Sequence, residues 1–313
     1  KIIRGRPRAG LVDTMTSLAT QLAGLAAQRA ARTDVANAVR QRDSYLFTPR
    51  VAAEQDYATV HALGVTGWEQ LVNEDAALAA FPHAELLFGD ESVRMDRATL
   101  PAAENARLDA ACTALLYLLG PVLLSRSAAK CVEWLVRRFA VHVHVPRVVV
   151  HVFLPYHTTP QFARMLQLLP VDREPALRFL APVKQAQTPL PTSLLLHAMA
   201  ADDDVLRLVA QTQAPADVPE RRVPVTFWTA TLVQFCVQLG APASRKRALP
   251  AHRAQEVLAV VLPETLRLLA PPVETEAAVG ALMVLCSLST AFALSPAAVR
   301  GVLESVARVA ERA

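Results

Sequence analysis

Apolar residues recur at helical spacing in one segment after another along this 313-residue chain. Residues 56–73, 104–119, 129–139 and 159–169 each place apolar side chains at i, i+3 or i+4, and i+7. No segment shows a convincing alternation of apolar and polar residues, the pattern of a half-buried strand. These patterns predict an all-α protein. Further helices are expected from Pro49 and over 16–31, 173–184, 190–200, 203–212, 226–239, 251–269, 273–292 and 296–311.

Proline and capping residues punctuate these predicted helices. The chain has 22 prolines but only 10 glycines, and proline fits the first turn of a helix. We expect Pro49 and Pro146 to open helices. Asp202, Asp203 and Asp204 are expected to lie at the start of a helix. Gly120 is expected to close the helix predicted over 104–119. A Rossmann-type or β-rich enzyme would carry more glycine in its turns and phosphate loops.

The architecture follows from how such helices bury their apolar faces. A pair of helices recurs about every 40 residues, the period of HEAT and armadillo arrays. One pair cannot bury its own apolar face, so neighbouring pairs must stack. The predicted fold is an α-solenoid of HEAT-like helical pairs, with a globular helical bundle as the alternative. We expect a flexible basic tail over 1–14, a helical domain over 15–185 and continuing HEAT-like repeats over 186–313.

Charge and cysteine content narrow the functional classes. Thirty-two Lys and Arg against 28 Asp and Glu give a net charge of +4, which predicts a mildly basic, solvated surface and is too small to indicate a nucleic-acid binder by itself. No CxxC motif is present, and each cysteine lies in an apolar helical pattern. Buried free thiols are therefore expected. The cysteines are Cys112, Cys131, Cys236 and Cys286.

One uncharged stretch, residues 277–299, is long enough to span a bilayer. It contains several hydroxyl side chains, and Ser295-Pro296 would stop a helix inside it. We therefore predict two packed core helices here and no membrane partner.

Four of the eight histidines lie between Leu135 and Pro170, which raises the possibility of a metal site. The HVH segment, expected on a strand or loop, and the spacing after it fit no zinc pattern supported by cysteines or carboxylates. No metal or other cofactor is predicted. The alternative is that these rings hydrogen-bond helix ends between stacked pairs, with Thr158 capping the next helix. The four are His142, His144, His151 and His157.

Motifs for common catalytic centres are absent from the sequence, which has no GxSxG, HExxH or P-loop. The chain is therefore predicted not to be an enzyme. A helical-bundle enzyme whose site assembles from distant residues is the alternative. A deep pocket with converging titratable groups would indicate it.

Basic residues gather in the N-terminal tail, in loops and at helix ends. Solvated charge is the default interpretation, and contact with RNA phosphate is the functional one, because exposed loops and tails can follow a nucleic-acid backbone. Glu133 and Arg137 are expected to form an i,i+4 surface pair, and Arg137 or Arg138 to face outward. The candidate RNA or partner contacts are Arg4, Arg6, Arg8, Arg137, Arg138, Arg245, Lys246 and Arg247.

A longer stretch carries a family resemblance. The sequence CVEWLVRRFAVHVH, followed by FLPYHTTPQFARMLQLL, resembles a signature near the N-terminus of the U3 small nucleolar RNA-associated protein 10 family, which are large nucleolar HEAT-repeat proteins. SYLFTPRVAA at 44–53 and LLF at 86–88 are also similar, and the specific likeness covers about 15–170. Val145-Pro146-Arg147 departs from the family's Asn-x-Asp helix start. Five apolar or aromatic residues are expected to pack a corner between two helix pairs: Trp134, Phe139, Tyr156, Phe162 and Met165. The signature residues are Trp134, Phe139, Pro155, Tyr156, His157 and Phe162.

The family's start resembles Met15-Thr16-Ser17-Leu18, so residues 1–14 are expected to be an extension ahead of it. The resemblance implies a non-catalytic scaffold of the nucleolar small-subunit processome, within its UTP-A (t-UTP) subcomplex and beside WD-repeat subunits. It implies a role in early pre-rRNA transcription, processing and 18S rRNA maturation, near the 5′ external transcribed spacer and the U3 snoRNP. A HEAT-type adaptor without an RNA role is the alternative, and salt-dependent RNA binding would separate the two.

Overall fold

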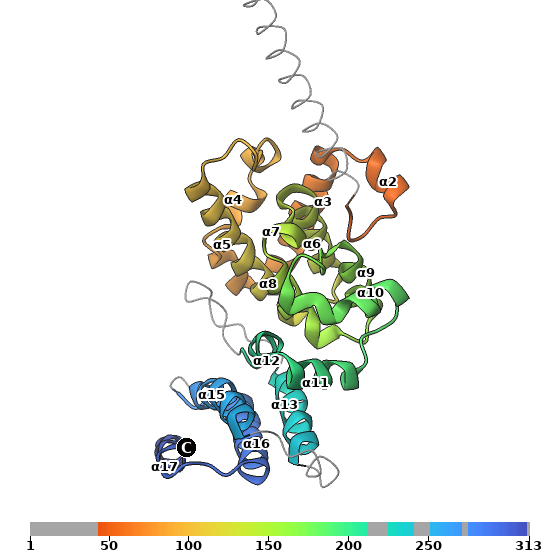
Figure 1. The fold of residues 1–313 in the computed structure, drawn as a ribbon. Helices are drawn as coiled ribbons and strands as arrows, with labels where there is room; N and C mark the ends of the chain where they lie inside the picture. The colour runs from red at the N-terminus through yellow and green to blue at the C-terminus, as the bar shows by residue number, and fades with distance from the viewer. Residues whose placement is uncertain (1–42, 212–224, 241–250, 271–274, 312–313) are drawn as a thin grey trace, which may run out of the picture.

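A computed structural model describes residues 43–211, 225–240, 251–270 and 275–311 (Figure 1). Within these ranges the chain forms helices joined by short connections and no strand. The helices stack along one long axis, with α2 near one end and α17 at the other (Figure 1). The predicted all-α solenoid is therefore confirmed. The predicted tail over 1–14 and the helix over 16–31 lie outside the described residues, and the division at 185 stays a prediction.

The N-terminal half is built on α3 (Tyr57–Glu74) and α6 (Arg126–Phe139). They run antiparallel, since Gly64 faces Trp134 while Gly67 faces Ser127. A Cβ atom on Gly64 would lie 2.7 Å from the Trp134 Cβ, so only glycine permits this close approach. The other helices here are α2 (Pro49–Glu54), α4 (Ala84–Phe88) and α5 (Ala102–Leu119).

The middle of the chain contains α7 (Val141–His144), α8 (Pro146–Phe153), α9 (Pro160–Leu168) and α10 (Ala181–Ala186). Pro146 opens α8 as predicted, but the HVH segment is the short helix α7 and not a strand or loop. Short 3-10 helices link these elements. They span Ala76–Ala80, Asp90–Val93, Gly120–Val122, Leu154–Tyr156 and Pro175–Leu180, the last of which takes the place of the first half of the helix expected over 173–184.

Two predicted helix ends are wrong in detail. Thr159, not Thr158, caps α9: its hydroxyl accepts the Phe162 N–H at 3.3 Å. Gly120 closes α5 as predicted, but at φ −46° it begins a 3-10 turn and does not adopt the left-handed conformation of a glycine cap. The described left-handed residues are Ala140 at φ 46°, between α6 and α7, and Gln187 at φ 53°, after α10. Sequence pointed to glycine at helix ends, whereas tertiary packing places alanine and glutamine there.

The C-terminal half forms two rows of helices. One row contains α11 (Thr192–Ala201), α13 (Val225–Gly240) and α16 (Thr275–Ala291), and α12 (Asp203–Ala210) packs on α15 (Ala251–Arg267) in the other. Helices α13 and α16 lie side by side and parallel, because Gly280 approaches Thr229 and Gly240 approaches Ala291. Parallel neighbours in one row are the arrangement of stacked helix pairs. The contacts join residues 51 apart (280 − 229 and 291 − 240), a longer repeat than predicted.

One continuous hydrophobic core joins the two halves, from Tyr45 to Leu288. Cys112, Cys131 and Cys236 are buried in it as free thiols, but Cys286 is exposed on α16, so the prediction of four buried cysteines is wrong for that residue. The stretch 277–299 forms α16 and the start of α17 (Pro296–Ala310). Among the described helices, none is both long and apolar enough to cross a membrane.

Candidate functional site

The Trp134 side chain lies at the centre of the signature segment. It is fully buried on α6, and its indole N–H donates to the Leu87 carbonyl at the end of α4 at 2.7 Å. The rings of His61 and Phe139 pack edge-on against it, with centroids 5.0 and 5.7 Å away. One aromatic side chain thus ties α3, α4 and α6 together.

Glu133, next to Trp134, is also fully buried. Its carboxylate accepts the Ser44 hydroxyl at 2.7 Å and two backbone N–H groups, those of Tyr45 at 2.7 Å and Leu46 at 2.8 Å. A buried carboxylate is stable only when donors surround it in this way. The predicted surface pair with Arg137 is therefore wrong: Glu133 holds the segment ahead of α2 against the core.

Arg137 is only 3% exposed. Its guanidinium donates to the Ala52 carbonyl at 2.8 Å and the Gln55 carbonyl at 3.0 Å, at the C-terminal end of α2. At this helix end the Ala52 carbonyl otherwise accepts only a long bond of 3.4 Å from the Gln55 N–H, so the arginine supplies the stronger donors that the last carbonyls need. The prediction that Arg137 contacts RNA or faces outward is thus contradicted, because its charge is enclosed by the protein's own backbone.

Arg138 is partly buried. Its Nε donates to the Ser92 carbonyl at 3.0 Å, and its guanidinium lies 4.7 Å from the Tyr57 ring centroid. Burial lowers the pKa of Arg138 from its usual value. A role for Arg138 in RNA or partner contact stays a prediction. The remaining candidates, Arg4, Arg6, Arg8, Arg245, Lys246 and Arg247, lie outside the described residues.

His142, His151 and His157 each contact a defined partner. His151 is buried between the Tyr117 hydroxyl (2.9 Å) and the carbonyl of Gln211 (3.1 Å), the residue that ends α12. His157 Nδ1 donates to the Leu190 carbonyl at 2.7 Å, and His142 Nε2 lies 3.2 Å from Asp43. The prediction that such rings bind helix ends is confirmed for His151. In the described part of the chain, no group of three or more His, Cys, Asp or Glu could hold a metal ion.

Burial sets the protonation state of His151. It lowers the pKa of this imidazole from 6.5 to about 4, while the Gln211 carbonyl acts weakly in the opposite direction. The ring is therefore neutral at physiological pH, and one N–H can donate to a carbonyl. The same burial raises the pKa of the Tyr117 hydroxyl to about 12. This pair joins α5, α8 and α12 as a neutral hydrogen-bonded chain.

The Pro155-Tyr156-His157 turn forms a second joint of the segment. The Tyr156 hydroxyl donates to the Gly120 carbonyl at 2.7 Å. His157 and Leu190 also exchange a backbone bond, in which the Leu190 N–H donates to the His157 carbonyl at 3.1 Å. Phe162 and Met165 are buried nearby on α9. The signature residues thus serve two joints, one around Trp134 and one around this turn, instead of a single corner.

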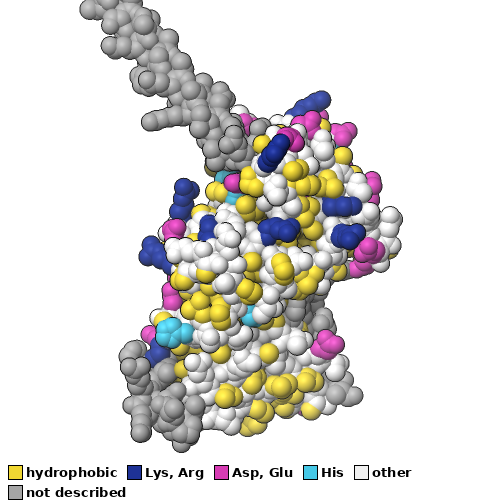
Figure 2. Space-filling model, turned by 90° about the vertical axis from the view of Figure 1, so that its right-hand side faces the viewer, with side chains coloured by type: hydrophobic (Ala, Val, Ile, Leu, Met, Phe, Trp, Pro, Cys, Tyr) yellow, Lys and Arg dark blue, Asp and Glu magenta, His cyan; other side chains and the backbone are white. Residues whose placement is uncertain are grey.

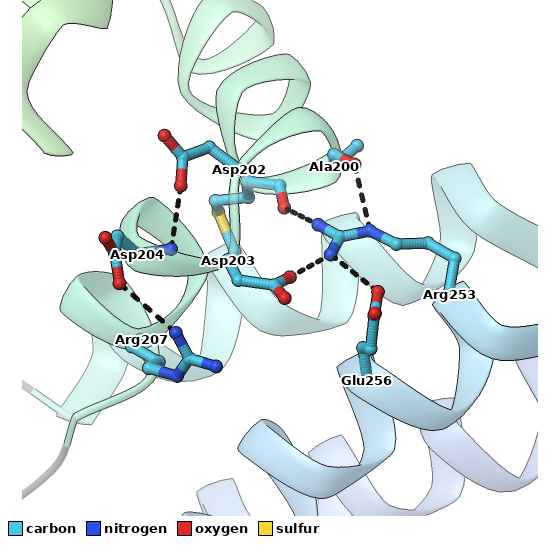
Figure 3. Close-up of polar contacts among 8 residues, drawn as sticks. Ala200, Asp202, Asp203, Asp204, Arg207, Arg253 and Glu256 are labelled. Carbon is cyan, nitrogen blue, oxygen red and sulfur yellow. Dashed lines mark hydrogen bonds and ion pairs between the residues drawn. The ribbon is translucent and has the colours of Figure 1, made fainter. Parts of the chain in front are cut away.

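A cluster that the sequence did not reveal joins α11 and α12 to α15 (Figure 3). Arg253 on α15 donates to the carbonyls of Met199 and Ala200, each at 3.2 Å, and forms ion pairs with Asp203 and Glu256. Asp202 caps α12 as predicted, accepting the Asp204 N–H at 2.8 Å. An exposed Arg207–Asp204 pair lies beside it (Figure 3). The acidic run thus serves both a helix cap and the attachment of the next helix layer.

Glu133, Asp43, His61 and Arg253 are the main residues that sequence reasoning missed. The signal for the first was present, because Glu133 lies between Val132 and Trp134 in the apolar stretch of α6. For Arg253 no local pattern could have identified partners 50 and 54 residues away. The charged groups in these joints bind backbone and ion-pair partners within the chain, which is the chemistry of a rigid scaffold.

Stacked helix pairs with buried polar joints define the class: a non-globular helical-repeat protein of the α-solenoid type. No protein-family model matches the chain. The chain is 40% identical over 321 residues to U3 small nucleolar RNA-associated protein 10 of Mycosarcoma maydis, covering 94% of this chain and 14% of that protein. It is 31% identical to the protein of that name in Aspergillus niger over 93% of this chain, and 34% identical to that in Neurospora crassa over 70%.

The chain therefore resembles U3 small nucleolar RNA-associated protein 10 along most of its length, which confirms the resemblance seen in its sequence. The likeness extends past residue 170, beyond the limit expected from the signature, because it covers 94% of the chain. The chain spans only 12% to 16% of the length of these relatives.

Proposed function

We propose that this chain is a non-catalytic scaffold segment of the small-subunit processome, the nucleolar 90S pre-ribosome. It acts in early pre-rRNA transcription and processing and in 18S rRNA maturation, mainly by docking other proteins. The observation that carries the proposal is the 40% identity to the Mycosarcoma maydis relative over 94% of the chain. That relative's name associates it with U3 small nucleolar RNA. The stacked helices add the broad, rigid sides that such docking requires.

In this proposal the partners are subunits of the UTP-A subcomplex, including WD-repeat proteins. Contacts with the pre-rRNA 5′ external transcribed spacer are secondary. They come from the basic tail (Arg4, Arg6, Arg8), the cluster Arg245-Lys246-Arg247 and Arg138. The structure supports a secondary role for RNA contacts, because Arg137, at the centre of the signature, donates its hydrogen bonds to the backbone at the end of α2.

The experiment is a segment exchange in Mycosarcoma maydis. The matching segment of its protein is replaced by this chain, and a deletion of the segment is the negative control. We expect the exchanged protein to co-purify with U3 small nucleolar RNA and to restore 18S rRNA levels, whereas the deletion does neither. A stable, nuclear exchanged protein that fails to recover U3 RNA would contradict the proposal and favour an adaptor with no RNA role.

A further inference from the structure

Helices α13 and α16 expose an unusual amount of uncharged surface. The two helices together contain 33 residues, of which Glu276 is the only charged one. Val237, Val279 and Met283 are 63%, 53% and 51% exposed. In Figure 2 hydrophobic side chains gather near the lower end of the molecule, where α13 lies, with few charged side chains among them. A helix that is apolar on all sides is usually covered on all sides.

A groove follows the line where these parallel helices meet. It has a volume of about 560 Å³. Along α13 its wall contains Thr226, Ala230 and Val233, and along α16 it contains Val279 and Met283. These positions recur every three or four residues, so the groove runs along the helix axes. A valley between two helices accepts the ridge of a third helix, as in helix-in-groove recognition.

The floor of the groove is a close contact between the two helices. Gly280 faces Thr229 so closely that a Cβ atom at this glycine would clash with the Thr229 Oγ1. Thr229 is only 7% exposed, and among the described residues its hydroxyl finds no hydrogen-bond partner. Buried hydroxyls nearly always have one. Thr229 lines the groove, but its Oγ1 atom is buried against Gly280, so the hydroxyl belongs to the contact between the two helices and is not offered to an occupant.

Charge decides the kind of occupant. Of the described residues that line the groove, only Glu276 is charged, and it lies one helical turn before Gly280. Among the residues that the structure describes, no cation lines the groove, so these residues offer nothing to RNA phosphate. A carboxylate at the end of an apolar groove favours a helix with a basic residue at the matching end.

We propose that the α13–α16 groove binds an amphipathic helix of a partner protein. The helix presents apolar side chains at i, i+3 or i+4 and i+7, and a Lys or Arg to Glu276. This inference deepens the proposed function and rests on it for the identity of the assembly, since a scaffold needs specific docking sites. The groove's chemistry itself can be tested separately.

The test is selection of a displayed library of 18-residue amphipathic helical peptides against the purified 313-residue chain. We expect a consensus with an apolar stripe and a Lys or Arg near one end. Glu276→Lys should change that end to Asp or Glu. Met283→Glu should weaken binding of the selected peptide about tenfold or more, the effect of losing a central apolar contact. Leu303→Glu, on an equally exposed apolar residue of α17 outside the groove, is the matched control and should leave binding unchanged.

The proposal is overturned if the selected peptides share no consensus. It is also overturned if the peptides selected against the Glu276→Lys variant keep the same Lys or Arg. Equal weakening by Leu303→Glu overturns it as well, as does self-association that Met283→Glu abolishes, which would identify a second copy as the occupant. A photoreactive residue in place of Val279 in the segment-exchanged Mycosarcoma maydis protein gives the assembly-level result. Cross-links to a basic amphipathic helix of another subunit support the groove. Cross-links to RNA, or none in a particle that contains U3 RNA, refute it while leaving the proposed function intact.

Discussion

Glu133 Oε2 accepts the backbone N–H of Tyr45 at 2.7 Å, although 88 residues separate them in the sequence. One turn further along α6, Arg137 donates to carbonyls of Ala52 and Gln55. The segment between Asp43 and Gln55 contains only one six-residue helix, so few of its backbone groups bond one another. The Glu133 carboxylate accepts N–H groups of this segment, and the Arg137 guanidinium donates to its carbonyls. Together these two side chains of α6 hold the segment on the core.

Replacing Glu133 with Gln keeps the shape of the side chain but removes its charge and turns one acceptor into a donor. The remaining oxygen can still accept the two backbone N–H groups, but without the negative charge, and the new amide NH2 group faces the Ser44 hydroxyl, which loses its acceptor in a buried site. We expect the free energy of unfolding, measured by urea titration of the purified chain, to fall by about 3 kcal/mol. Glu69→Gln on the exposed face of α3 is the control and should change it by less than about 0.5 kcal/mol. Equal effects of the two changes would mean that the buried carboxylate is not needed.

Trp134→Ala removes the largest fully buried side chain and leaves a cavity beside Gly64. The expected loss is about 3–5 kcal/mol. Trp134→Phe keeps most of the ring but leaves the Leu87 carbonyl without its donor, so it should cost less, about 1–3 kcal/mol. Urea titration of both variants gives the order. A loss below about 1 kcal/mol for the alanine variant would place this ring on a surface and contradict the structure.

Helical periodicity was sufficient to predict most of this fold. Apolar stripes located α3, α5, α6 and α9, because each helix buries one face and periodicity records which face. Helix ends were predicted less well. Ala140 takes the left-handed position and Thr159 the cap, since the packing of α6 against α7 and the position of Pro160 decide these ends, not the preference of a single residue.

The polar joints were the least predictable part. An i,i+4 Glu–Arg pair usually lies on a helix surface, and nothing local distinguishes Glu133 and Arg137 from such a pair except their apolar neighbours. Their partners come from a segment more than 80 residues earlier. The Arg253 cluster likewise depends on how two helix layers meet. When the partner of a polar side chain is determined by tertiary structure, the local sequence gives little indication of which residue it is.

His151 makes folding stability depend on pH. Its folded-state pKa of about 4 lies below its ordinary value of 6.5, so the unfolded chain binds the proton first as the pH falls. The neutral ring's contribution is complete above pH 6.5 and is lost between pH 6.5 and 4, by about 3 kcal/mol in total. Urea titrations across this range should show a smaller pH dependence for His151→Gln. The exposed control His197→Gln should retain the full dependence, and an unchanged slope in His151→Gln would refute the assignment.

Arg253 attaches α15 to the preceding layer through a planar guanidinium that binds two carbonyls and two carboxylates (Figure 3). Lysine keeps the charge but cannot match that fork. We expect Arg253→Lys to lower the free energy of unfolding by about 1–3 kcal/mol. Arg207→Lys, in the exposed pair beside it, should change it by less than about 0.5 kcal/mol. Rescue of full stability by lysine at position 253 would show that charge alone is sufficient there.

The last prediction concerns RNA. Reversing the charges of Arg245, Lys246 and Arg247 to Glu should weaken binding to a pre-rRNA 5′ fragment, because phosphate contacts depend on cations in exposed loops. Each lost contact should reduce the slope of log affinity against log salt by about 0.7–0.9, and the melting temperature should stay the same. Arg137→Gln is the informative contrast: with its guanidinium bound to Ala52 and Gln55, it should lower stability and leave the salt slope unchanged. Unaltered binding by the triple variant would exclude this cluster as an RNA contact. If the affinity of the unmodified chain for RNA does not change with salt concentration, an adaptor without an RNA role is favoured.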